Sequence, residues 1–394
     1  MKPLEGLVVL DMTRVLAGPF AAMMFADMGA EVIKIERPDG GDDTRAYPPF
    51  QNGESAYFMS LNRGKRSVTL NLKHEKGKEI LKSLARKCDI LIENFKPGTM
   101  DKLGVGYEVL SKENPRLIYA ASSGFGQTGP YSSRPAYDLI IQGMGGMMSV
   151  TGPDEHTPTK VGSSVADIFA GLFATIGILA AVNSRMRTGR GQLVDVAMLD
   201  SMVAVLENAV SRYLVSGEVP HPIGNKHPSI APFSTLATSD GAMNVAVGND
   251  EIWRRLCGVL EMKEFEKDPR FADNASRVAN FDELKAILEE RTGKNTTDHW
   301  LAELEKVSVP SGPINDIAHV VNDPQVLARK MIVEVLHPVA GLMKIPGVPI
   351  KFSGTPAEVE APAPLLGEHT EKILSSYLGL SDAEIADLRK DGVI

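Results

Sequence analysis

Cysteine is scarce in this sequence, which has only two such residues, Cys88 and Cys257, among 394. They lie far apart in the chain and form no pairing pattern. This excludes a disulfide-stabilised extracellular scaffold and is typical of a reducing, cytoplasmic setting. The N-terminal residues place Glu5 and Asp11 around a very short apolar run, so we expect no signal peptide.

Positive charge is also in short supply, because 42 Lys and Arg residues face 50 Asp and Glu residues and leave a net charge of -8. A broad basic surface for nucleic acid or for an anionic membrane is therefore not expected. Any anionic ligand must be held by a few local cations.

Several catalytic signatures are missing as well. The sequence has no G-x-S-x-G motif and no P-loop, so neither serine-hydrolase nor P-loop chemistry is indicated. Its eight histidines are scattered, and the nearest pair, His221 and His227, lies in a proline-rich stretch rather than at ligand spacing on a helix. We therefore expect no metal site.

What is present is the pattern of a two-domain α/β protein. The apolar and charged fractions, 43% and 23%, are those of a globular protein, and 394 residues exceed one ordinary core. Short apolar segments alternate with helical ones, which predicts a doubly wound, mostly parallel sheet. The predicted strands are 7–10, 31–35, 67–72, 89–93, 117–122 and 192–197, and the predicted helices include 17–28, 76–87 and 200–216.

A change of composition at Gly217 marks the first predicted domain boundary, because the stretch that follows holds four prolines and has no hydrophobic periodicity. From such changes we predict five parts. They are a large domain over 1–216, a linker over 217–231, a smaller α+β domain over 232–332, a second linker over 333–352, and a C-terminal segment over 353–394 that returns to the large domain.

Polar residues gather where the predicted strands end. Glu36 after the second strand is typical of NAD-binding folds, but the first turn lacks the G-x-G-x-x-G fingerprint, which opposes NAD. Arg37, Lys73, Asn94 and Lys96 follow strand ends, at the edge where doubly wound sheets collect ligands. Taken singly, each is better explained as a solvated loop residue, whereas together they favour a phosphate-bearing ligand.

A long uncharged run over 168–184 contains no proline and predicts a buried helix that begins near Ser164. It is short for a membrane span and includes Gly, Thr and Asn, so we expect a core helix. Asp167 falls in its first turn, where backbone N–H groups lack intrahelical partners. The local sequence leaves two roles open for this carboxylate: a helix cap, which the residue type favours, or a reactive nucleophile.

Longer motifs carry a family resemblance. The pattern L-x-G-x-x-V-L-D-x-T-R-V-x-A-G-P over 4–19 resembles the start of class III coenzyme A transferases of the CaiB/BaiF type. The further motifs are GAEVIKIERPxxGDxTR over 29–45, NRGKRSVTLNLK over 62–73, ENFKPGTMDKLG over 93–104, GFGQTGPYSSRPAYD over 124–138, TGRGQxVDVAMLDS over 188–201 and PLLGEHT over 364–370. They follow one another in order over essentially the whole chain.

The resemblance implies a Rossmann-like large domain built from both ends of the chain, a small domain between linkers, and a homodimer of interlocked chains. It also implies that Asp167 is the catalytic nucleophile, which reverses the preference for a cap. Asp167 would attack an acyl-CoA thioester to form an aspartyl anhydride. CoA would then form an aspartyl-CoA thioester, from which a carboxylic acid takes over the CoA. The helix start would keep Asp167 ionised.

The resemblance further assigns binding positions. Arg37, Lys73 and Lys102 would hold the phosphorylated ADP head, with Asn94 and Phe95 beside the nucleotide. The other substrate- or CoA-binding positions are Val15, Leu16, Leu72, Lys96, Arg134, Ala136 and Tyr137. Candidates for the acyl or acceptor group are Asp138, Lys226 and His227, and a surface role for the last two is an equal alternative. No cofactor beyond CoA, no metal ion and no NAD is expected.

Related activities remain as alternatives. α-Methylacyl-CoA racemases of the same superfamily carry a His before the Asp in the segment that matches 136–138. This chain has Tyr137 there, which removes one of two acid/base groups. Formyl-CoA:oxalate transferases carry a glutamine where this chain has Leu16, and a tetraglycine loop that this linker lacks. The resemblance therefore favours transfer to a dicarboxylate from a succinyl-CoA-type donor. A non-catalytic acyl-CoA-binding protein is opposed by Asp167 at its helix start.

Overall fold

The computed structural model describes residues 1–394. The chain forms two compact units: the first comprises 1–147, 161–215 and 324–394, and the second comprises 148–160 and 216–323. The first unit is thus assembled from both ends of the chain. These units differ from the predicted domains in three places: 148–160 and the predicted linker over 217–231 belong to the second unit, and the chain rejoins the first unit at Pro324.

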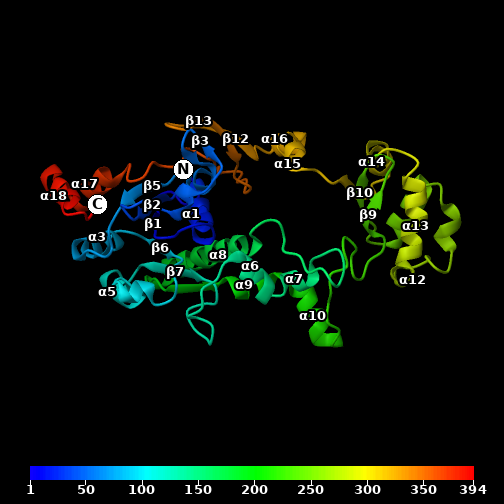
Figure 1. The fold of residues 1–394 in the computed structure, drawn as a ribbon, viewed down its shortest axis with the longest axis horizontal. Helices are drawn as coiled ribbons and strands as arrows, with labels where there is room; N and C mark the ends of the chain where they lie inside the picture. The colour runs from blue at the N-terminus through cyan, green and yellow to red at the C-terminus, as the bar shows by residue number, and fades with distance from the viewer. The chain divides into compact units, whose positions relative to one another are not determined.

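Six parallel strands form the sheet of the first unit, in the order β5-β2-β1-β6-β7-β8 (Figure 1). The strands are β1 (Val8–Asp11), β2 (Glu31–Glu36), β5 (Arg66–Thr69), β6 (Ile90–Glu93), β7 (Ile118–Ser123) and β8 (Leu193–Ala197). The predicted doubly wound parallel sheet is confirmed. From β1, the strands β2 and β5 follow on one side of the sheet, and β6, β7 and β8 follow on the other. The strand order therefore switches between β1 and β6, and ligands of such sheets bind at this point, beyond the carboxyl ends of the strands.

Helices cover both faces of this sheet. On β1, Val9 packs with Phe25 and Ile178 on one face, while Leu10 packs with Leu81 on the other. Burial on both faces explains why this strand is a continuous apolar run rather than an alternating one. The first face carries α1 (Ala17–Asp27) and α8 (Val165–Thr188), and the second carries α3 (Glu75–Ala85), α5 (Tyr107–Glu113), α17 (Thr370–Leu378) and α18 (Asp382–Lys390).

Helix α8 is the predicted long apolar helix. By length and composition it is the one helix that could cross a membrane, but Ile178 and Ala181 lie in the core cluster of the sheet. Small residues bring α8 close to α1, since a Cβ on Gly171 would lie 2.7 Å from the Ala17 carbonyl oxygen. At its other end, Arg185 donates to Asp89 Oδ1 at 2.9 Å, and this pairing ties the helix to the start of β6.

The C-terminal segment covers the β5 edge of the sheet. The Thr69 N–H donates to Thr370 Oγ1 at 3.0 Å, and the Asn71 N–H donates to the Val393 carbonyl oxygen at 2.7 Å. Ile373 and Leu388 join the core under α3. An otherwise open edge strand is thereby given hydrogen-bond partners.

Three predicted segments differ from the structure. The polar segment over 38–62, for which the sequence predicts no helix or strand, contains η1 (Asp43–Ala46), a hairpin of β3 (Phe50–Gln51) and β4 (Glu54–Ser55), and α2 (Ala56–Asn62). The predicted helix over 200–216 is divided into α9 (Met198–Val205) and α10 (Glu207–Ser216). The predicted second linker is a hairpin of β12 (Ile332–His337) and β13 (Gly341–Pro346), whose Met343 packs with Phe58 of α2. Short elements escaped prediction because their stability comes from this distant packing.

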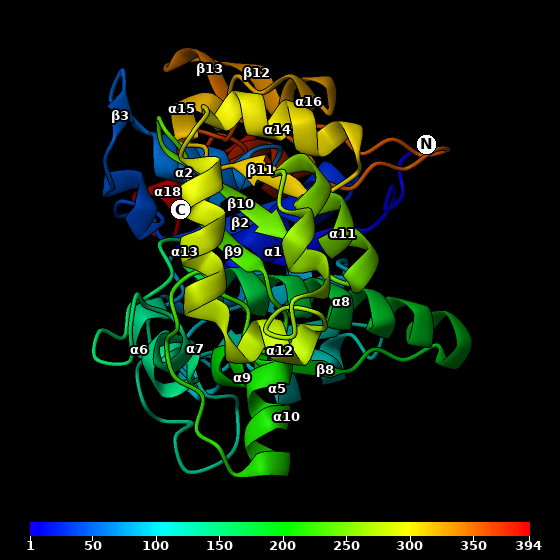
Figure 2. The same ribbon diagram turned by 90° about the vertical axis from the view of Figure 1, so that its right-hand side faces the viewer.

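The second unit has its own antiparallel sheet, in the order β11-β10-β9, and a core around Trp253, Phe271 and Met243 (Figure 2). Its elements are β9 (Phe233–Ala237), β10 (Ala242–Ala246), α11 (Asp250–Val259), η2 (Lys263–Lys267), α12 (Asn274–Ala279), α13 (Phe281–Thr292), α14 (Thr297–Lys306), β11 (Ser311–Pro313) and α15 (Ile317–Val320). The remaining helices of the chain are α4 (Thr99–Lys102), α6 (Asp138–Met144), α7 (Met147–Val150) and α16 (Pro324–Ala328).

Candidate functional site

A cavity of about 400 Å³ opens beyond the carboxyl ends of β1, β2 and β5. It lies at the edge where the strand order predicts a ligand. Five residues assigned by the family resemblance line it together: Arg37, Leu72, Lys73, Phe95 and Lys102. Its lining also includes Thr13 and Arg14 of the turn that leads into α1.

Cations at the cavity suit an anionic ligand. Arg37 donates to Asp43 Oδ1 at 3.0 Å and remains more than half exposed. Arg14, which the sequence did not single out, pairs with Asp43 Oδ2 at 3.3 Å and lies 5.2 Å from the centre of the Phe95 ring. Lys73 and Lys102 are exposed and have no carboxylate partner. Their charges are therefore available to phosphate groups.

Two predicted CoA-binding residues, Asn94 beside the nucleotide and Lys96, do not line this cavity. The Asn94 side chain accepts from the Arg14 N–H at 2.8 Å and donates to the Arg14 carbonyl oxygen at 2.7 Å. Its amide thus supports the turn before α1 rather than projecting free into the cavity. Lys96 is exposed and does not line the cavity.

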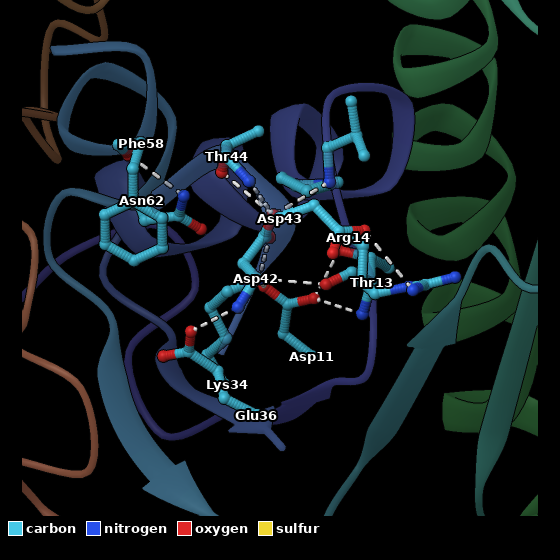
Figure 3. A network of polar contacts seen from close by, with 12 residues as sticks. Asp11, Thr13, Arg14, Lys34, Glu36, Asp42, Asp43, Thr44, Phe58 and Asn62 are labelled. Atoms are coloured by element: carbon cyan, nitrogen blue, oxygen red, sulfur yellow. Dashed lines mark hydrogen bonds and ion pairs between the residues drawn. The ribbon is translucent and has the colours of Figure 1, made fainter. Parts of the chain in front are cut away.

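A buried network of charged side chains contacts the backbone of the turn over 13–16, which precedes α1 (Figure 3). Lys34 is fully buried, pairs with Asp42 at 2.9 Å and donates to the Thr13 carbonyl oxygen at 2.9 Å. Burial raises the pKa of Asp42, but Lys34 and hydrogen bonds from Thr44 outweigh it and bring that pKa to about 2. Asp42 Oδ1 also accepts from the N–H of Val15, whose φ of 68° is held by this contact.

Lys65 completes the network through Asp11, whose Oδ2 also lies 4.0 Å from Lys34 Nζ. It donates to Asp11 Oδ2 at 2.8 Å and to Asn62 Oδ1 at 2.9 Å, and burial lowers its pKa to about 8. Sequence reasoning missed these groups. The available signal was a lysine inside the apolar strand EVIKI and an aspartate directly after LVVL.

Asp167 lies in the first turn of α8, two residues into the helix from Val165. Burial first, and then the nearby charge of Asp138, raise its pKa to about 7, against the opposing effect of a hydrogen bond from the Ala17 backbone. The helix start therefore does not keep the pKa of this carboxyl in its ordinary range. Desolvation outweighs the helix dipole.

The cap of α8 is supplied by another residue. Ser164 occupies the N-cap position without a side-chain hydrogen bond, and the Ala166 N–H is bound by Asp138 Oδ1 at 3.0 Å. Asp167 bonds instead with the Ala17 backbone at the start of α1. It lies where α1 and α8 begin, so the positive ends of both helix dipoles are close to this carboxyl group.

Tyr57 is a further site residue that the sequence did not reveal. Burial first, and then the charge of Asp167, raise its pKa to about 12. Its ring meets Tyr47 edge-on at 5.9 Å. Tyr57 belongs to α2, inside the segment over 38–62 for which the sequence predicts no helix or strand, so nothing in the pattern connects it with Asp167. A hydroxyl that stays protonated can donate to an anion beside the carboxylate.

The remaining predicted binding positions of the first unit do not line the cavity. Leu16 is the N-cap of α1, and Ala136 packs closely on Gly124. Tyr137 precedes α6 with its side chain 74% exposed, and Arg134 lies 3.9 Å from the centre of the Tyr131 ring.

Lys226 and His227 belong to the second unit. Lys226 lies over the Phe281 ring at 5.2 Å, and His227 Nδ1 accepts from the Ser229 N–H at 3.1 Å. Across the chain, no group of three or more His, Cys, Asp and Glu side chains is arranged to hold a metal ion.

Comparisons with known proteins agree with this geometry. The model of CoA-transferase family III matches residues 4–370. An acetyl-CoA:oxalate CoA-transferase of Acetobacter aceti is 46% identical over 368 residues, covering 93% of each chain. A succinyl-CoA:glutarate CoA-transferase of Mus musculus is 42% identical over 395 residues, covering 100% of this chain and 91% of the relative.

The fold has a close counterpart among solved structures. The crystal structure of a CAIB/BAIF family protein from Brucella suis is 45% identical and superposes with a TM-score of 0.85. The match covers 95% of this chain and 99% of that protein.

Proposed function

The chain belongs to CoA-transferase family III, and from this premise we propose that it moves CoA from an acyl-CoA to a dicarboxylate through covalent intermediates on Asp167. Transfer of CoA between an acyl-CoA and a carboxylate is the activity that its relatives share by name. The observation that carries the proposal for Asp167 is its position. It is half-buried at the start of α8, the capping role is taken by Asp138, and it bonds to the start of α1.

In this proposal the cavity beyond β1, β2 and β5 accommodates the nucleotide of CoA. Arg37, Lys73 and Lys102 pair with its phosphates, and Phe95 offers an aromatic face to the adenine. The turn over 13–16 then leads from the cavity to the start of α1, where Ala17 meets Asp167. The pantetheine arm follows this turn and brings the thioester to the carboxylate.

The reaction proceeds in four balanced steps. The ionised Asp167 oxygen attacks the thioester carbon, the carbon–sulfur bond breaks, and an aspartyl anhydride and CoA thiolate form. The thiolate attacks the aspartyl carbonyl carbon and releases the donor as a free carboxylate, leaving aspartyl-CoA. The acceptor carboxylate attacks this thioester and releases the thiolate again. The thiolate then attacks the acceptor carbonyl of the new anhydride, which yields acceptor acyl-CoA and free Asp167.

Each step passes through an oxyanion and an intermediate that water would destroy. The N–H groups at the starts of α1 and α8 stabilise the oxyanion. The Tyr57 hydroxyl, which burial and the charge of Asp167 keep protonated, would be a further donor to it. Burial around Asp167 limits hydrolysis, and the same burial raises its pKa to about 7.

The experiment that tests this proposal is intact-protein mass spectrometry with an acyl-CoA donor and no acceptor, followed by hydroxylamine or borohydride trapping. Succinyl-CoA and acetyl-CoA are the donors to use first, and oxalate and glutarate are the acceptors for the complete exchange, because the relatives carry these names. An adduct that maps to Asp167 and disappears in Asp167→Ala is expected. Exchange activity that persists in Asp167→Ala would refute the covalent route.

We also propose a homodimer that works in the cytoplasm. Exposed apolar side chains support the dimer: Ile176 and Met186 of α8 are 61% and 80% exposed, and a second copy would cover them. The two cysteines, Cys88 and Cys257, are both free and buried, as suits a reducing compartment. Light scattering that gives the mass of a single chain at micromolar concentration would refute the dimer.

A further inference from the structure

Helix α6 places two polar side chains against the segment that carries Asp167. Asp138 and Gln142 are one helical turn apart and therefore share a face of α6. Asp138 Oδ2 accepts from Gln142 Nε2 at 2.7 Å, so each side chain orients the other. Gln142 is fully buried within an otherwise apolar, glycine-rich stretch, where an unpaired amide would be costly.

The partners of these side chains are backbone groups just before and inside the first turn of α8. Asp138 Oδ1 accepts from the Ala166 N–H at 3.0 Å, and Gln142 Oε1 accepts from the Val161 N–H at 2.9 Å. Gln142 Nε2 also approaches the Ser163 carbonyl oxygen at 3.4 Å. Two side chains of one helix thus hold the backbone of 161–166 at three points.

Apolar packing fixes α6 in the same place. Ile141, which lies between the two polar residues, is fully buried and packs in one cluster with Ala166 and Ala17. These are the neighbour of Asp167 in the chain and its backbone partner at the start of α1. The starts of α1 and α8 are therefore held against the same face of α6.

We propose that Asp138 and Gln142 form a clamp that fixes the first turn of α8 and supplies its cap, so that the Asp167 carboxylate is left for covalent chemistry. This inference rests on the function proposed above. It gives Asp138 a positioning role in place of the acyl- or acceptor-binding role predicted from its motif, because both of its oxygens are already engaged by protein groups.

The two roles of Asp138 differ in which half of the reaction they serve. A clamp acts before any acceptor is present, so Asp138→Ala should slow adduct formation from the donor alone. The expected loss is on the order of 10²-fold, as for a nucleophile displaced by about 1 Å. The affinity for free CoA should stay unchanged, because Asp138 does not line the cavity. Donor-only adduct formation within threefold of the wild-type rate would overturn the clamp.

A double variant tests the hydrogen-bond pattern itself. In Asp138→Asn the new amide faces the Gln142 amide, so two donors oppose each other and the rate should fall. In Asp138→Asn with Gln142→Glu, the Asn oxygen again accepts from Ala166, the Asn amide donates to the Glu, and the Glu accepts from Val161. The double variant should recover at least tenfold of the rate lost in Asp138→Asn. A double variant that is no faster than the single one would overturn the clamp.

Hydrogen exchange in substrate-free protein separates the clamp from the proposed function. The Ala166 amide should exchange faster in Asp138→Ala, with circular dichroism unchanged, and an unchanged exchange rate would overturn the clamp. Wild-type protein that forms no adduct with any donor would refute the function, and amide exchange alone would then decide on the clamp. Ser381→Ala is the matched control, since it removes the cap of α18 without touching the cavity, and it should leave the adduct rate unchanged.

Discussion

Ionised Asp167 should lower the free energy of unfolding of this protein at neutral and higher pH. Its pKa is about 7 in the folded chain against an ordinary value of 3.8, so the folded state holds the proton more tightly than the unfolded state does. Stability is therefore greatest when both states are protonated, and it falls as the pH rises from about 4 to about 7. A difference of about 3 units corresponds to a cost on the order of 4 kcal/mol above that window.

Replacing Asp167 with Asn removes this cost, because an amide cannot ionise and its oxygen can still accept from Ala17. Asp167→Asn should therefore be more stable than the wild type by on the order of 4 kcal/mol at pH 8, narrowing to about 2 kcal/mol at pH 5. Urea unfolding should be followed by far-ultraviolet circular dichroism, which reports the helix content of the chain and so includes α8. Tryptophan fluorescence is unsuitable, because Trp253 and Trp300 both lie in the second unit.

A control with the opposite sign is available in the same chain. Asp273 caps α12, and its pKa is lowered by a hydrogen bond from the Ser276 backbone. Asp273→Asn should destabilise the protein at neutral pH, with a difference that disappears as the pH falls. If Asp167→Asn gives no added stability at pH 8, or a gain that does not change between pH 5 and 8, the account of Asp167 as a desolvated carboxylate is wrong.

Three further outcomes are expected. The rate of adduct formation from the donor should rise with pH around a midpoint near 7, because only ionised Asp167 attacks, and a quenched-flow profile flat from pH 5.5 to 8.5 would contradict this. Lys102→Ala should weaken CoA by about tenfold but barely affect dephospho-CoA in calorimetry, and equal losses for both ligands would remove Lys102 from the 3′-phosphate site. Gly171→Ala should cost about 1–3 kcal/mol of stability, because its Cβ would meet the Ala17 carbonyl oxygen at 2.7 Å. Gly258→Ala on α11 has open space around it and should raise the melting temperature in the same assay.

The sequence was sufficient to predict those elements and site residues for which the local residue pattern agrees with the observed burial. The strands of the first unit and the start of α8 near Ser164 followed from apolar runs and from the absence of proline. The carboxyl-edge cluster was also found, since Arg37 and Lys73 follow strand ends and do line one cavity. These features depend on residues close to one another in the chain.

Features that depend on distant neighbours were not predictable. The role of Asp167 depends on Asp138, which comes 29 residues earlier, because the cap of α8 is donated by another helix. Tyr57 was missed because α2 packs against β13, nearly three hundred residues later in the chain. The break at Leu206 between α9 and α10 has no proline or glycine to mark it, and nothing in the structure explains it.

The closure of the β5 edge by residues 367–393 has a consequence for the order of events during synthesis. While the ribosome is still making the chain, Thr69 and Asn71 lack the partners that α17 and α18 bring last. The second unit, over 216–323, has its own core and can fold before residues 367–393 are made. The larger unit still exposes apolar surface at that stage, because its core includes side chains of α17 and α18. Nascent chains of this protein should therefore depend on chaperones until residues 367–393 have emerged, and most strongly for the first unit.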